Sequence, residues 1–68
     1  MWVVMSEDWG VGRALDVTGQ DLAGIETALK EARSGDRKPH YVTGTFLGDS
    51  TLTRVNVTAL SGARLVQE

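Results

Sequence analysis

The chain has 68 residues and a formal net charge of −2, with no cysteine and one histidine. A chain of this length is near the lower limit for one hydrophobic core, so residues 1–68 are expected to form a single domain. Without cysteine there are no disulfides, and one histidine argues against a structural zinc site. Small domains without such staples are often completed by self-association. We therefore expect a homo-oligomer or a complex with a protein partner.

The charges are unevenly distributed along the chain. Residues 1–29 hold five acidic residues and one arginine, whereas residues 30–40 hold four basic and two acidic residues. This mild polarity differs from the strongly basic balance of most nucleic-acid-binding domains. The opening segment MWVVMSEDW lacks the basic start and long apolar core of a signal peptide, and no apolar run approaches transmembrane length. We expect a cytoplasmic protein with no membrane contact.

Two short strands are predicted at the start of the chain. Residues 2–5, WVVM, are a continuous run of strand-forming side chains, and residues 13–17, RALDV, alternate apolar and polar positions. Residues 7–12 between them predict a loop. Together these segments indicate an antiparallel hairpin.

The segment TGQDLAGIETALKEARSG predicts one amphipathic helix. Thr18 is the expected N-cap, with Asp21 as its capping-box partner, and Gly35 is the expected left-handed stop. Gly24 lowers the helix propensity and either admits a neighbouring strand or is simply tolerated. Apolar side chains recur at steps of three and four and form one stripe: Leu22, Ile25, Leu29 and Ala32.

A second hairpin is predicted after the helix. Residues 40–47 and 52–58 are rich in β-branched and aromatic side chains, and a turn signal separates them. A two-residue and a four-residue loop give the same pairing, in which Val42 lies opposite Val57. Residues 63–66 can add a last edge strand.

These elements predict an α+β domain with a single antiparallel sheet of four or five short strands, in ββαββ order. One helix packs on one side of this sheet and covers only part of it. The opposite face of the second hairpin is rich in threonine. That face is expected either to be solvated or to be buried against another subunit.

No catalytic constellation is evident in the sequence. His40 is the only histidine, and neither Ser50 nor Ser61 has the glycine-rich elbow or the partner order of a hydrolytic triad. We therefore predict no enzymatic activity, no catalytic residues, no metal and no cofactor.

Two sets of side chains are candidate binding residues. Trp9 lies in a polar loop, where it either folds back on the core or anchors a partner. Tyr41 and Arg54, on the polar face of the second hairpin, complete the candidate protein-binding set. The candidate anion-binding or nucleic-acid-binding residues surround the helix exit: Arg33, Arg37, Lys38 and His40.

The leading functional hypothesis is a non-catalytic binding or regulatory module that self-associates or docks on a protein partner through its sheet. One alternative is a nucleic-acid-binding regulatory protein that uses the basic helix-exit loop and the hairpin face. This alternative is less favoured because the hairpin face holds few basic residues. Another alternative is an accessory subunit of an enzyme complex. Arginine outnumbers lysine, and isoleucine and asparagine occur once each, which is the bias expected of a GC-rich bacterium or its phage.

Overall fold

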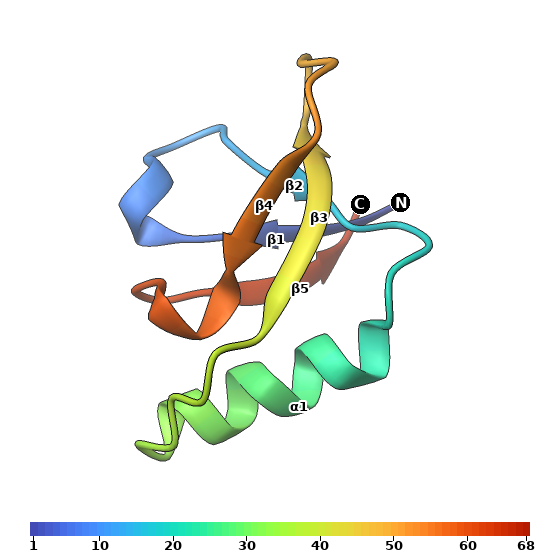
Figure 1. Cartoon of the computed structure of the whole chain (residues 1–68). Helices are drawn as coiled ribbons and strands as arrows, with labels where there is room; N and C mark the ends of the chain where they lie inside the picture. The colour runs from blue at the N-terminus through green and yellow to red at the C-terminus, as the bar shows by residue number, and fades with distance from the viewer.

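The computed structural model describes all 68 residues as a five-stranded antiparallel sheet with one helix (Figure 1). In chain order the elements are β1 (Trp2–Met5), the 3₁₀ turn η1 (Glu7–Trp9), β2 (Leu15–Asp16), α1 (Leu22–Arg33), β3 (Tyr41–Phe46), β4 (Thr53–Asn56), the 3₁₀ turn η2 (Val57–Ala59) and β5 (Arg64–Gln67). The strands lie in the order β4-β3-β2-β1-β5. The α+β class is confirmed, but the element order is ββαβββ instead of ββαββ, because the optional last strand is present.

The sheet is curled, so that its two halves share one core. Figure 1 shows β3 and β4 crossing in front of β1 and β5, with α1 below them. The core draws side chains from both halves of the sheet, from α1 and from η2: Val4, Leu15, Val17, Ile25, Leu29, Val42, Val57 and Ala63. The helix packs mainly against η2 and β5. The sheet therefore covers much of its own inner face, which one flat sheet under one helix would not do.

The predicted first hairpin is confirmed, although its second strand is only two residues long. Val3 pairs with Asp16 and Val4 with Leu15, and β1 pairs with β5 along its other edge. A strand with neighbours on both sides is shielded from water, and Val3 and Val4 are completely buried.

The helix begins three residues later than predicted, because Thr18 is not its N-cap. The Thr18 hydroxyl accepts a hydrogen bond from the Trp2 amide at 3.0 Å. Asp21 caps the helix instead, and its carboxylate accepts from the Gly24 amide at 3.0 Å. A Cβ at residue 24 would collide with this carboxylate, so the glycine makes room for the cap and not for a strand. Gly35, with φ of 99°, ends the helix as predicted.

The second hairpin is present, but its predicted register is wrong by two residues. Val42 pairs with Val55 and not with Val57, because β4 ends at Asn56 and Val57 begins η2. A shift by an even number of residues leaves the paired side chains of β3 and β4 on their predicted faces, whereas Thr58, in the predicted strand 52–58, leaves the strand for η2 and is buried. Val42 therefore still points into the core, while Tyr41 points outward.

Asn56 fastens the base of this hairpin to η2. Its side-chain oxygen accepts hydrogen bonds from the Thr58 hydroxyl at 2.8 Å, the His40 amide at 3.0 Å and the Thr58 amide at 3.3 Å. Thr58 is only 2% exposed, so water cannot easily replace a lost acceptor. One side chain thus joins the residue before β3, the end of β4 and η2.

We predict that Asn56→Ala lowers the free energy of unfolding by about 2 kcal/mol, because buried donors at Thr58 lose their acceptor. Asn56→Asp keeps an oxygen in the same place and is expected to cost less than half as much. Urea denaturation followed by circular dichroism measures both values. Equal losses in the two variants would show that this oxygen is not what stabilises the joint.

Candidate functional site

Three of the five large hydrophobic side chains that the structure leaves exposed belong to the β3–β4 hairpin. They are Tyr41, Leu47 and Leu52, with exposed fractions of 54%, 44% and 71%. Side chains alternate along a strand, and the Leu47 amide extends the ladder beyond β3 by donating to the Ala14 carbonyl at 2.9 Å. Alternation therefore places Tyr41 and Leu47 on one face, and Leu52 lies on that face two positions before Arg54. We call Tyr41, Leu47, Leu52 and Arg54 the outer hairpin face.

Arg54 is stacked on Tyr41 within this face. The central carbon of its guanidinium group lies 4.3 Å from the centroid of the Tyr41 ring, a cation–π geometry. The observed register brings the two side chains together. Arg54 pairs with Thr43 and Asn56 pairs with Tyr41, so Arg54 and Tyr41 are diagonal neighbours on the same face of the hairpin. The guanidinium donates no hydrogen bond within the chain, so its N–H groups remain available to an external acceptor.

Trp9, the third candidate protein-binding residue, lies elsewhere. It is half-buried and packs against the core. Its ring meets Phe46 edge to face, with centroids 4.9 Å apart and an angle of 87°. The Arg13 guanidinium lies 4.2 Å from the centroid of the same Phe46 ring. Of the two alternatives for Trp9, the structure shows the contact with the core and does not place Trp9 on the outer hairpin face.

The predicted basic cluster at the helix exit is divided by internal hydrogen bonds. Arg33 donates from Nη2 to the Ala63 carbonyl at 3.1 Å. Arg37 donates from Nη1 to the Thr58 carbonyl at 2.9 Å. Both arginines thus fasten the helix exit to the segment that links β4 to β5, and they do not converge on a shared anion site.

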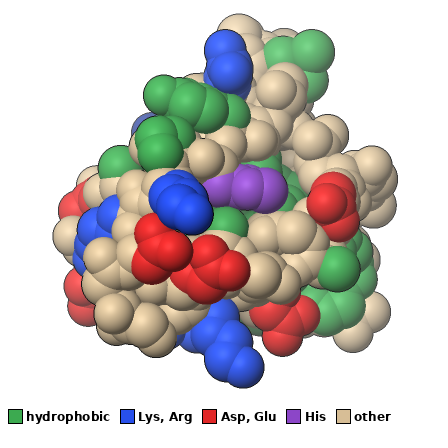
Figure 2. Space-filling model, turned by 60° about the horizontal axis from the view of Figure 1, so that its bottom comes forward, with side chains coloured by type: hydrophobic (Ala, Val, Ile, Leu, Met, Phe, Trp, Pro, Cys, Tyr) green, Lys and Arg blue, Asp and Glu red, His purple; other side chains and the backbone are tan.

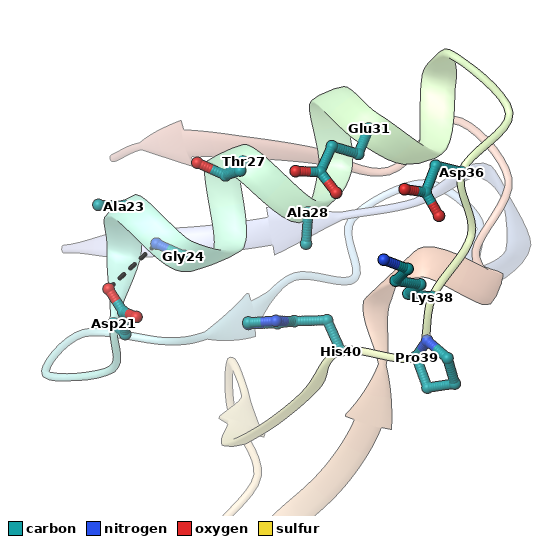
Figure 3. Close-up of a pocket in the computed structure, with 10 residues that line it drawn as sticks. All are labelled: Asp21, Ala23, Gly24, Thr27, Ala28, Glu31, Asp36, Lys38, Pro39 and His40. Atoms are coloured by element: carbon teal, nitrogen blue, oxygen red, sulfur yellow. Dashed lines mark hydrogen bonds between the residues drawn. The ribbon is translucent and has the colours of Figure 1, made fainter.

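Lys38 and His40 line a groove of about 440 Å³ between α1 and residues 36–40 (Figure 3). Figure 2 shows the histidine in a hollow with acidic and basic side chains around it. Three carboxylates line the groove and outnumber its one lysine, which disfavours an anion: Asp21, Glu31 and Asp36. These side chains do not gather into a group that could hold a metal ion.

One carboxyl group has a clearly shifted pKa. Hydrogen bonds from the Thr18 amide and the Thr18 hydroxyl hold the pKa of Asp16 below its usual range. The amide bond is 2.9 Å long. A lowered pKa keeps the carboxylate ionised. Asp16 therefore accepts hydrogen bonds from Thr18 and stabilises the turn of the chain between β2 and α1.

Leu47 and Leu52 were not among the binding residues predicted from the sequence. Both flank the turn between β3 and β4. Leu47 is six residues after Tyr41 and Leu52 is two residues before Arg54, and these even spacings could have predicted that all four side chains share one face. No protein-family model, no curated protein and no solved structure matches the chain. The structure holds no helix of the length and apolarity needed to cross a bilayer.

We predict that Arg37→Ala lowers the free energy of unfolding by about 1–2 kcal/mol, because it removes a charge-assisted hydrogen bond to the Thr58 carbonyl. Lys38→Ala is the matched control and should change stability by less than about 0.5 kcal/mol. Thermal denaturation of the two variants measures the difference. An equal effect of both substitutions would contradict the structural role of Arg37.

Proposed function

We propose that this protein is a non-catalytic binding module that self-associates or docks on a protein partner through its sheet, with the outer hairpin face as the contact surface. The observation that carries this proposal is the gathering of one aromatic, two leucine and one arginine side chains on one face of one hairpin. Aromatic and arginine side chains are enriched at protein interfaces and dominate their binding energy.

The order within the hairpin also supports this role. Binding costs conformational entropy when long side chains become fixed. Arg54 is already held against Tyr41 in the free protein, and Asn56 fixes the base of the hairpin. Association therefore costs less side-chain conformational entropy than it would with a disordered hairpin.

The nucleic-acid alternative has weaker support. The stacked Tyr41 could serve as a platform for a base, but Arg33 and Arg37 are engaged with backbone carbonyls and Lys38 lies among carboxylates. An accessory role in an enzyme complex would rely on the groove at His40, where no reactive pair is formed. A cytoplasmic location stays part of this proposal, and the amino-acid composition favours a GC-rich bacterium or its phage as the source.

We predict that Leu52→Glu weakens the association of this protein at least about tenfold, because it places a charge in the apolar part of the contact surface. Val11→Glu is the matched control, since Val11 is an exposed apolar residue like Leu52 but lies in the loop after η1. Sedimentation velocity measures self-association. Affinity capture from a lysate of the source organism, followed by titration of the captured protein, measures binding to a partner.

The expected result is that Val11→Glu keeps the association and Leu52→Glu loses it. A protein that stays monomeric at high micromolar concentration and captures nothing would contradict the proposal. So would an association that depends on Val11 and not on Leu52.

A further inference from the structure

We infer that the partner presents an extended acidic segment, which adds as a strand to the free edge of β4 and places a carboxylate beside Arg54. This inference rests on the proposed function and specifies the chemistry of the partner. It follows from the open edge of the sheet, from the unused donors of Arg54 and from the side chains on either side of it.

The edge of β4 away from β3 is open. In an antiparallel ladder, successive residues point their backbone groups alternately toward the two neighbours. The Val57 amide donates to the His40 carbonyl at 3.0 Å, so the alternate residues Val55 and Thr53 also point toward β3. The backbone N–H and C=O groups of Arg54 therefore point away from the sheet, as do those of the residues two positions before and after it.

The opposite edge of the sheet is not equivalent. There β5 is in contact with α1, and the Arg33 guanidinium binds the Ala63 carbonyl next to that strand. Unpaired edges are templates for strand addition. Only the edge of β4 presents such a template together with an exposed aromatic and arginine pair.

The charge of Arg54 selects the partner residue opposite it. In an antiparallel pair the residue facing Arg54 shares its face of the sheet, with Cα atoms about 5.5 Å apart. Arg54 is stacked over Tyr41 and donates to no acceptor in this chain, and the rest of the outer hairpin face is aromatic or leucine and holds no carboxylate. A glutamate or aspartate at this position supplies the missing acceptor.

The neighbours of Arg54 define the remaining positions. The partner residue two positions further along its strand faces Leu52, whose side chain is largely exposed, so an apolar residue fits there. The partner residues immediately before and after the acidic one lie beside Val55 and Thr53 and suit β-branched side chains. The inferred segment therefore has an acidic residue followed two positions later by an apolar one.

A second copy of this chain is a poorer occupant of the same edge. If two β4 strands pair symmetrically about Arg54, the two guanidinium groups face each other across the strands. Like charges directly opposite are destabilising in a sheet. The charge pattern thus points to a different, acidic chain.

The test is a titration of the ¹⁵N-labelled protein with the acetylated and amidated peptides TVEVL and TVQVL, which differ only in the charge of the central residue. We expect the glutamate peptide to bind about two- to five-fold more tightly than the glutamine peptide, the range of one cross-strand ion pair. The largest amide shifts should fall at Arg54 and Leu52. In an Arg54→Gln variant the two peptides should bind equally.

Equal affinities of the two peptides for the unmodified protein would overturn the inference, as would shifts confined to surfaces other than β4. Protection of the Arg54 amide on concentrating the protein without peptide would assign the edge to a second copy and also overturn it. These outcomes are separate from failure of the proposed function, because Leu52→Glu would still disrupt association through the face of the hairpin.

Discussion

The side-chain oxygen of Asn56 is the interaction on which the geometry of this protein depends. It accepts three hydrogen bonds at the point where β4 ends, η2 begins and the chain enters β3. Without this acceptor, the buried amide and hydroxyl of Thr58 would have to be desolvated unpaired. Because Asn56 is satisfied internally, β4 stops there, η2 carries Val57 into the core, and the hairpin leaves the core in a fixed direction. The orientation of the outer hairpin face therefore depends on the partly buried hydrogen bonds of Asn56.

The curl of the sheet changes what is left for a partner to cover. A flat sheet with one helix would leave a broad apolar face bare. Here β3 and β4 fold across β1 and β5, and α1 covers η2 and the β5 side. The exposed features that remain are local, and they include the edge of β4 and the outer hairpin face with its Tyr41–Arg54 stack. Such a surface suits recognition of an extended segment by backbone pairing combined with a few side-chain contacts.

Local sequence signals predicted the elements of this fold but not the contacts between distant parts of it. The helix and strands follow from periodicity and composition, and Gly35 ends α1 as its type requires. The N-cap was misassigned because the Thr18 hydroxyl is recruited by the Trp2 amide, which is a tertiary contact. The hairpin register was misassigned because Asn56 accepts from Thr58 and turns the chain before Val57. The basic cluster was predicted from proximity in sequence, whereas the carbonyls that Arg33 and Arg37 bind lie about 20 to 30 residues away. Trp9 was left with two alternatives, and its packing on Phe46 is likewise a contact between distant segments.

Amide hydrogen exchange, measured residue by residue by NMR, tests this account most directly. We expect slow exchange at His40 and Thr58, whose amides are bound to the Asn56 oxygen, and at Val57, whose amide is bound to the His40 carbonyl just before β3. We expect fast exchange at Arg54 in the free protein, because that amide points away from the sheet. Fast exchange at His40 and Thr58 would show that the joint at Asn56 does not form. Slow exchange at Arg54 in dilute protein would show that the edge of β4 is already covered.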